Sequence, residues 1–162
     1  MDIKIRKMSL DDIQKVLDIY RHGIDIKATF ETKLPNIEEW DEKHLKVCRI
    51  VALIDKNIVG WAALMSVSNR EVYKGVAEVS CYISPNHTRK GIGTLLMNKL
   101  ISMSEQEGFW TLEVKIVEDN IPSILLCEKC GFRLVGYKER LGYDRDGVWK
   151  NIVIMERRSK LI

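Results

Sequence analysis

A short segment near the middle of the chain combines glycines, basic residues and a helix start in a way that suits an anion. Residues 89–94 (RKGIGT) follow a β-rich run at 79–83, and apolar residues recur at helical spacing from Ile92 onward. The first N–H groups of a helix lack partners within it and carry partial positive charge. Glycine lets a phosphate approach that backbone closely, and Arg89 and Lys90 add charge. The segment predicts a phosphate or pyrophosphate site. The alternative is an ordinary helix start with two solvated cations.

Two common phosphate-binding loops do not fit this segment. The dinucleotide fingerprint needs a third glycine at the position of Leu96, and the P-loop needs a Gly-Lys-Ser/Thr ending that occurs nowhere in the chain. We therefore expect a loop that holds phosphate without either of these patterns.

The β-rich run before the glycines carries a carboxylate on one of its faces. Side chains alternate along a strand, so each face takes every second residue. The two faces are Glu78, Ser80 and Tyr82, and Val79, Cys81 and Ile83. A carboxylate just before an anion-binding loop is a candidate general base. The alternative is a surface glutamate on a half-exposed strand.

Strands and helices that position these residues follow from the hydrophobic pattern. Strands are expected at 2–6, 48–54, 58–64, 77–83, 112–116, 132–137 and 148–155, and helices begin near Ser9, Asn36, Ile92 and Asn120. The second helix runs toward Leu45, the third is closed by Gly108 and the fourth ends before Gly131. This order predicts one α/β domain over residues 1–162 on a single mixed sheet, antiparallel at first and with crossover helices later. It argues against a doubly wound nucleotide fold.

Composition excludes several classes of protein. The 162 residues carry 26 Lys plus Arg and 23 Asp plus Glu, and the resulting net charge of +3 is too weak a bias to indicate nucleic acid binding. Apolar runs fall short of the roughly 20 residues that a membrane-spanning helix needs, so no membrane association is expected. The first residues alternate apolar and charged types, which indicates a strand and not a signal peptide.

Cysteine usage indicates reduced thiols and a cytoplasmic protein. The four cysteines lie mostly within apolar segments, which is typical of core packing. Cys127 and Cys130 have a C-x-x-C spacing, but this pair supplies two ligands where structural zinc needs four. We expect no metal site.

The glycine segment resembles the pyrophosphate loop of the GNAT-type N-acetyltransferases, whose pattern is Gln/Arg-x-x-Gly-x-Gly/Ala. Thr88 stands at the Gln/Arg position, a departure that leaves the backbone cradle intact. The expected element order is similar to the GNAT fold along the whole chain. Further segments resemble the phosphinothricin and methionine sulfoximine acetyltransferase branch: residues 28–32 (ATFET), 39–40 (EW), 82–85 (YISP), 120–123 (NIPS), 142–143 (GY) and 148–151 (VWKN), and the spacing of Arg70 and Tyr73 before Glu78.

The resemblance implies a splayed mixed sheet and an acetyl-CoA-dependent enzyme that acetylates the amine of a small amino-acid-like substrate by direct transfer. Glu78 matches the proposed catalytic glutamate of this branch. The implied contacts to acetyl-CoA come from Cys81, Tyr82, Ile83, Arg89, Lys90, Gly91, Ile92, Gly93, Thr94 and Asn120, and the implied substrate contacts from Phe30, Arg70, Tyr73 and Ser80. Asn120 is equally expected as a helix N-cap. The resemblance further implies a homodimer.

One family feature is missing. Many GNAT enzymes carry a tyrosine near the end of the helix after Asn120, proposed to protonate the leaving thiolate, and Cys127 stands there.

Two alternatives to an amino-acid acceptor remain. The first is the same fold with a protein N-terminus, a polyamine or an aminoglycoside as acceptor, and the second is an acyl-CoA-binding sensor without turnover.

Overall fold

The computed structural model describes all residues 1–162 and contains one seven-stranded mixed sheet. Its strand order is β1-β2-β3-β4-β5-β7-β6. The strands are β1 (Ile3–Lys7), β2 (Ile50–Ile54), β3 (Asn57–Ser66), β4 (Val76–Ile83), β5 (Thr111–Val117), β6 (Arg133–Tyr143) and β7 (Trp149–Arg158). Only β4 and β5 are parallel neighbours, and every other pair is antiparallel. The predicted α/β fold on a single mixed sheet is confirmed.

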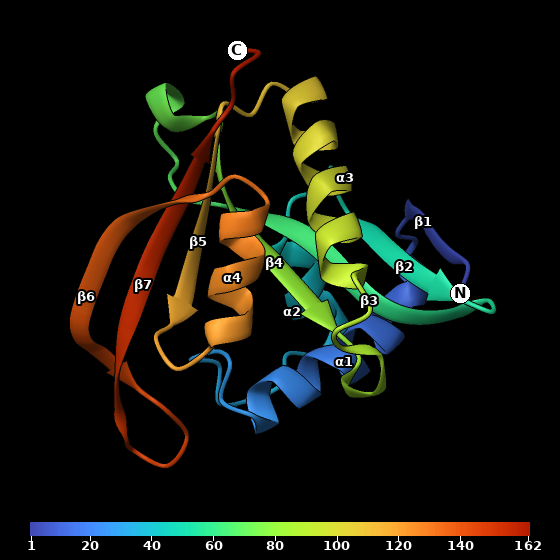
Figure 1. Cartoon of the computed structure of the whole chain (residues 1–162), viewed down its shortest axis with the longest axis horizontal. Helices are drawn as coiled ribbons and strands as arrows, with labels where there is room; N and C mark the ends of the chain where they lie inside the picture. The colour runs from blue at the N-terminus through green and yellow to red at the C-terminus, as the bar shows by residue number, and fades with distance from the viewer.

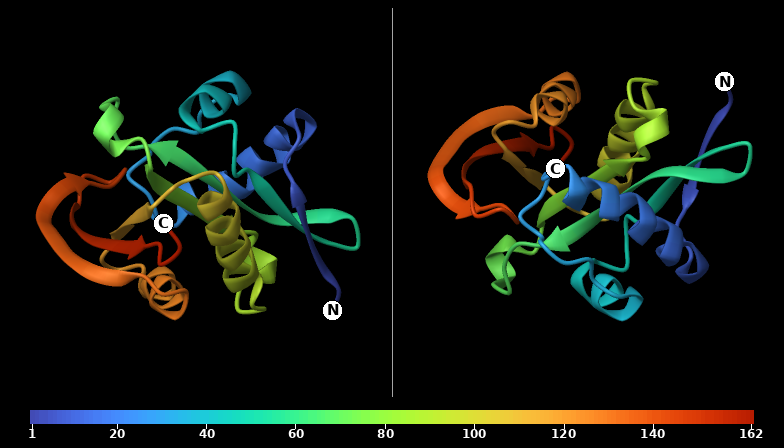
Figure 2. Two further views of the ribbon diagram at one scale, coloured as in Figure 1. Left: turned by 90° about the horizontal axis from the view of Figure 1, so that it is seen from above. Right: turned by 90° about the horizontal axis from the view of Figure 1, so that it is seen from below.

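Four α-helices cover the two faces of this sheet. Helices α3 (Ile92–Gln106) and α4 (Ile121–Lys129) lie on one face, and α1 (Ile13–Asp25) and α2 (Ile37–Lys43) lie on the other (Figures 1 and 2). Short 3₁₀ turns occur at Leu10–Asp12, Glu71–Tyr73 and Pro85–His87. None of the helices has both the length and the apolar character needed to cross a bilayer.

Each face of the sheet has its own hydrophobic core. The alternation of β4 sends Ala77 and Val79 into the core under α3 and α4, and it sends Tyr82 toward the core under α1 and α2. In β3, Ala62 and Leu64 belong to the first core, whereas Trp61 and Ala63 belong to the second. The period-2 pattern of buried central strands therefore fixes which side chains meet which helices.

The sheet opens between β4 and β5. Their pairing is restricted to Val76–Glu78 against Thr111–Glu113, although both strands continue for several residues beyond. Figure 1 shows the two strands diverging, with α4 in front of the opening. Glu78 is the last paired residue of β4, so it lies at the point where the opening begins. The splayed sheet expected from the resemblance is present.

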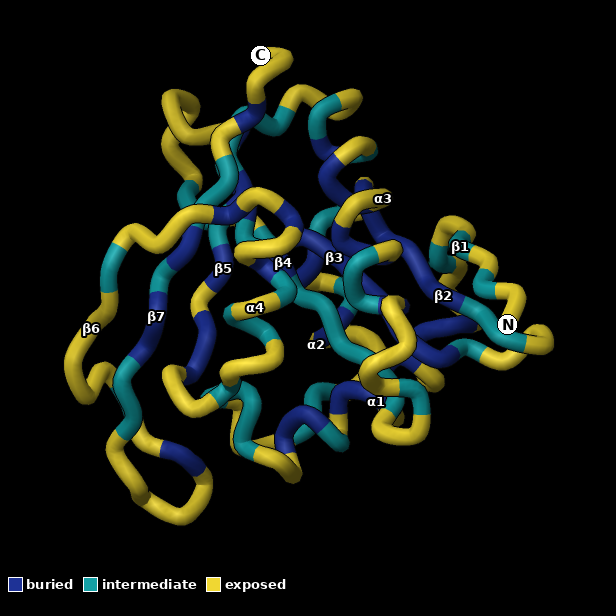
Figure 3. The backbone as a smooth tube through the Cα atoms, viewed as in Figure 1, coloured by how far each residue is buried: buried dark blue, intermediate teal, exposed yellow.

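Several predicted boundaries differ from the observed ones. The first helix was expected to begin at the Ser9–Asp12 signal. The Ser9 N–H does donate to the Asp12 carboxylate, but the signal begins a 3₁₀ turn that runs directly into α1. The second helix ends at Lys43, before the predicted Leu45. Strand β6 extends to Tyr143, past the predicted residue 137, and two register shifts interrupt its alternation. Most of β6 is exposed at the edge of the sheet (Figure 3).

Candidate active site

A cleft of about 570 Å³ occupies the opening between β4 and β5. It is lined by residues from both faces of the sheet, including Val114 and Cys127 from the α3–α4 side and Tyr20 and Trp61 from the α1–α2 side. The cleft therefore passes through the sheet. Of the predicted site residues, it brings together Phe30, Glu78, Ser80, Cys81, Tyr82 and Asn120.

Glu78 faces a lysine across the opening. The Lys115 Nζ lies 3.8 Å from a Glu78 carboxylate oxygen, and both residues line the cleft. The Glu78 side chain is 22% exposed and the Lys115 side chain 46% exposed. Lys115 comes from β5, two residues beyond the last paired position, Glu113. The cleft thus contains an acid and a cation whose separation exceeds the usual hydrogen-bond length.

The glycine segment forms the start of α3. Gly91 is the N-cap at φ +78°, and a Cβ at this position would meet nothing within 4 Å. The N–H groups of Ile92, Gly93 and Thr94 make no backbone hydrogen bond, because the first bond of the helix runs from the Leu95 N–H to the Gly91 carbonyl. Open space, free donors and the positive end of the helix dipole together fit a pyrophosphate group.

Basic side chains flank this helix start and remain accessible. Arg89, at φ +61°, and Lys90 are exposed and make no ion pair. The Thr88 hydroxyl donates to the Pro85 carbonyl at 3.4 Å, so it serves the local turn. The backbone cradle does not depend on the side chain at this position.

Helix α4 is held close to the start of α3. Asn120 caps α4, and its side-chain oxygen accepts a hydrogen bond from the Ser123 N–H at 3.4 Å. The predicted N-cap is confirmed, and the contact of Asn120 with a cofactor stays a prediction. A Cβ on Gly93 would lie 3.0 Å from a methyl group of Leu126. Glycine at this position therefore allows the first turn of α3 to approach α4.

Cys127 lies in the wall of the cleft. It occupies the position at which many GNAT enzymes carry a tyrosine that is proposed to protonate the leaving thiolate. Its side chain is buried in the core under α3 and α4, and burial raises the pKa of its thiol to about 12. A coenzyme thiol resembles an ordinary thiol with a pKa of about 8.5, so proton transfer to it from Cys127 would be unfavourable. Cys130 belongs to the same core, which fits the predicted packing role of both residues.

Aromatic rings form the wall on the α1–α2 side. Tyr82 stacks on Trp61 with ring centroids 5.2 Å apart and meets the edge of Tyr20 at 4.9 Å. Burial is the main cause that raises the pKa of Tyr82, so its hydroxyl stays protonated. The indole N–H groups of Trp40 and Trp61 are buried without a partner. Each unpaired donor costs about 1–3 kcal/mol, so apolar and aromatic packing must stabilise this wall.

Phe30 reaches the cleft from the loop after α1, and the β6–β7 hairpin supports that loop. A Cβ on Gly142 of β6 would lie 3.0 Å from the Phe30 ring. Nearby, Lys27 pairs with Asp146, and Arg145 pairs with Asp25 at 3.1 Å. The lining residues around Phe30 are therefore positioned by the C-terminal part of the chain.

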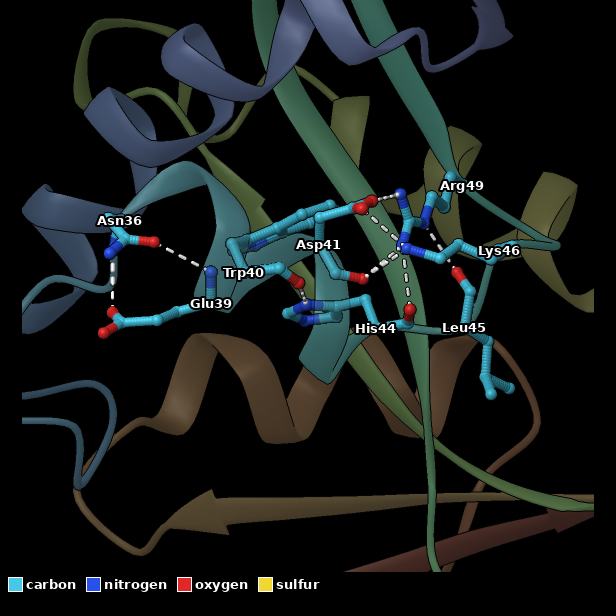
Figure 4. Close-up of polar contacts among 8 residues, drawn as sticks. All are labelled: Asn36, Glu39, Trp40, Asp41, His44, Leu45, Lys46 and Arg49. Carbon is cyan, nitrogen blue, oxygen red and sulfur yellow. Dashed lines mark hydrogen bonds and ion pairs between the residues drawn. The ribbon is translucent and has the colours of Figure 1, made fainter.

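A polar cluster anchors α2 and the segment after it (Figure 4). The Arg49 guanidinium donates to the Leu45 carbonyl at 2.6 Å, to the His44 carbonyl at 2.8 Å and to both backbone and side chain of Asp41. It also lies over the Trp40 ring, 5.1 Å from the centroid. His44 stacks on Trp40, and burial lowers the pKa of its imidazole to about 4. His44 is therefore neutral near pH 7.

Arg70 and Tyr73, expected to contact substrate, do not line the cleft. Both are exposed near the 3₁₀ turn that precedes β4, and the guanidinium lies over the Tyr73 ring at 5.5 Å. Ile83 and residues 89–94 also lie outside the cleft lining, on β4 and at the start of α3. The predicted roles of all these residues stay predictions.

Some cleft residues were not predicted as site residues, although two of them, Thr29 and Trp40, lie in segments that carry the resemblance. They are Tyr20, Thr29, Trp40, His44, Trp61 and Lys115 among others. Trp61 and Lys115 occupy strand positions on the same face as Glu78, which is the one signal that periodicity offers. The remaining residues come from loops and helices whose packing no local pattern specifies.

Comparison with known proteins agrees with this geometry. Residues 13–132 match the model of the acetyltransferase (GNAT) family. The chain is 28% identical to phosphinothricin N-acetyltransferase of Streptomyces viridochromogenes, over 98% of this chain and 89% of that protein. It is 24% identical to L-methionine sulfoximine/L-methionine sulfone acetyltransferase of Pseudomonas aeruginosa, over 96% and 94%.

A solved structure shares both fold and sequence. The crystal structure of a phosphinothricin acetyltransferase from Sinorhizobium meliloti in complex with acetyl-CoA superposes with a TM-score of 0.89 at 27% identity, covering 98% of this chain and 89% of that one. The match to the family model spans more than half of the chain. The protein therefore belongs to the acetyltransferase (GNAT) family and is an N-acetyltransferase enzyme.

Proposed function

We propose that the protein transfers the acetyl group of acetyl-CoA to the α-amine of a small amino-acid-like molecule, of the phosphinothricin or methionine sulfoximine type. The observation that carries this proposal is the position of Glu78, in the cleft at the start of the β4–β5 opening, on the same strand that leads to the anion-binding start of α3. Two relatives described above are named for acetylating phosphinothricin and methionine sulfoximine, and these substrates support the acceptor class.

The donor side uses backbone groups. Acetyl-CoA supplies an acetyl thioester and a pyrophosphate. The free N–H groups at the start of α3 are suited to the pyrophosphate, and Arg89 and Lys90 add attraction. Beyond residue 78, β4 no longer pairs with β5, so backbone groups near Cys81 are available to hold the thioester arm and to stabilise the developing oxyanion. The S. meliloti structure, which contains acetyl-CoA, supports this assignment.

On the acceptor side, Glu78 accepts a proton from the ammonium group, directly or through a water molecule. The amine nitrogen then bonds to the acetyl carbon and loses its second proton to solvent, the carbon–sulfur bond breaks, and the leaving coenzyme thiolate is protonated to its thiol. Because Cys127 is a poor acid, solvent supplies that proton. Ser80 and Phe30 border the same space and complete the acceptor side.

An acceptor panel tests the proposal. Purified protein and acetyl-CoA are incubated with phosphinothricin, methionine sulfoximine, spermidine, kanamycin and a peptide with a free N-terminus, and release of coenzyme thiol and acetylation of the acceptor are both followed. We expect the highest kcat/KM with the two amino-acid analogues. Transfer only to the peptide, the polyamine or the aminoglycoside would contradict the acceptor class, and no transfer to any amine would contradict the whole proposal.

A further inference from the structure

The cleft contains two acid–base pairs of very different closeness. Lys43 and Glu31 lie 2.6 Å apart in a hydrogen-bonded pair. Lys115 and Glu78 lie 3.8 Å apart, beyond hydrogen-bond distance. Lys115 is also the only cleft lysine whose partner is the proposed base. Its ammonium group is thus near the proposed base and has no hydrogen-bonded partner.

Other cations are less suited to meet an acceptor at this place. Arg70 is exposed outside the cleft lining, over the Tyr73 ring. His44 lines the cleft, but it is buried against Trp40 and neutral, with its Nδ1 2.8 Å from the Trp40 carbonyl. The positive charge beside Glu78 that has no hydrogen-bonded partner therefore belongs to Lys115.

A fixed positive charge next to the base has a chemical consequence for the acceptor. An amine that arrives as a lone cation is attracted by Glu78 and repelled by Lys115. An α-amino acid carries its ammonium and carboxylate groups on one carbon, so it can pair with both residues at once. The loose contact between Glu78 and Lys115 allows these two charge-assisted contacts to replace it.

We propose, building on the proposed function, that Lys115 binds the carboxylate of the acceptor and so selects α-amino acids over amines that lack an acid group. The spacing of Glu78 and Lys115 at the start of the β4–β5 opening sets this preference. The acceptor nitrogen is thereby turned toward Glu78, and the cation stays paired with the carboxylate while Glu78 takes the proton.

Matched acceptors test the proposal. L-methionine sulfoximine is compared with its carboxamide, which keeps the amine and loses the acid, and the ratio of their kcat/KM values is measured in the wild type and in Lys115→Met and Lys115→Arg. Because ratios are compared between variants, the different basicity of the two amines cancels. We expect Lys115→Met to lower the acid-to-amide ratio about tenfold or more, through a higher KM for the acid. Lys115→Arg, which keeps the charge, should restore most of it.

Further variants decide whether the effect belongs to Lys115. An unchanged ratio in Lys115→Met would overturn the proposal, and so would an equal loss in Lys43→Met or Arg70→Gln. Melting temperature and acetyl-CoA affinity, measured for each variant, confirm that the fold and the donor site are intact. If the wild type acetylates acid and amide equally well, this proposal fails while the proposed function stands. If it acetylates neither, the proposed function fails and this inference falls with it.

Discussion

The segment after α2 and the segment before α3 use their polar groups in opposite ways. Around Arg49, the guanidinium donates to three backbone carbonyls and to the Asp41 carboxylate, and the cluster is largely closed to further partners. At the start of α3, the N–H groups of Ile92, Gly93 and Thr94 have no partner, and Gly91 leaves open space beside them. Polar groups that are satisfied within the protein stabilise the fold, whereas groups left free at a helix start are available to a ligand.

The largest effect is expected in the region whose polar groups are available to a ligand, that is, β4 and the start of α3. Glu78→Gln removes the proposed base and keeps the shape of the side chain, so kcat should fall by about 10²–10⁴-fold. The dissociation constant of acetyl-CoA, measured by calorimetry, should stay within about twofold, because the donor groups lie at the start of α3. Unchanged turnover would contradict the role of Glu78.

The next effect tests the Arg49 cluster, whose polar groups are satisfied within the protein. Arg49→Met leaves the buried carbonyls of His44 and Leu45 without their donor and removes the cation over Trp40, so the free energy of unfolding should fall by about 3–5 kcal/mol. Urea unfolding measures this loss. Lys46→Met is the matched control, because Lys46 binds the same Asp41 from an exposed position and should cost less than about 1 kcal/mol. Equal losses in the two variants would show that the cluster is not cooperative.

A pH titration examines the same cluster through His44. Burial lowers the pKa of folded His44 to about 4, whereas the unfolded residue titrates near 6.5. Between these values the unfolded chain binds the extra proton, so stability should fall as the pH falls from 6.5 to 4, by up to about 3 kcal/mol. The difference in unfolding free energy between wild type and His44→Gln, followed across this range, isolates the contribution. A difference independent of pH would exclude a buried neutral imidazole.

The smallest expected effect returns to the start of α3. Removing both exposed cations in Arg89→Ala/Lys90→Ala should raise the dissociation constant of acetyl-CoA about 5–10-fold at low salt, and much less at high salt, because ions screen exposed charges. Lys99→Ala, an exposed lysine farther along α3, serves as the control. A loss that persists at high salt would indicate direct contacts in place of long-range attraction.

Local sequence patterns account for much of this architecture. Alternation and helical periodicity predicted the order of all the strands and α-helices, and they placed Glu78, Ser80 and Tyr82 on one face of β4. They could not predict the length of β6, because this edge strand is exposed and two register shifts break its alternation. A strand without a buried face lacks the hydrophobic pattern from which its end could be inferred.

Fewer of the contacts in the candidate site could be predicted from the sequence, because they join residues that lie far apart along the chain. The proximity of Lys115 to Glu78 depends on the register of two parallel strands separated by an entire helix, and no local pattern encodes that register. The ring contacts of Tyr20, Trp61 and Tyr82 likewise join three separate elements. The anion-binding segment was predictable because its glycines, cations and helix start are contiguous.

The β6–β7 hairpin supports the Phe30 loop, so the acceptor side of the cleft depends on the last part of the chain to be synthesised. The pair between Asp25 and Arg145 closes a separation of 120 residues, and the Phe30 ring rests on Gly142. During synthesis, the segments that form the donor site emerge long before this hairpin does. The acceptor side of the cleft therefore gains its final wall only when almost the whole chain is available.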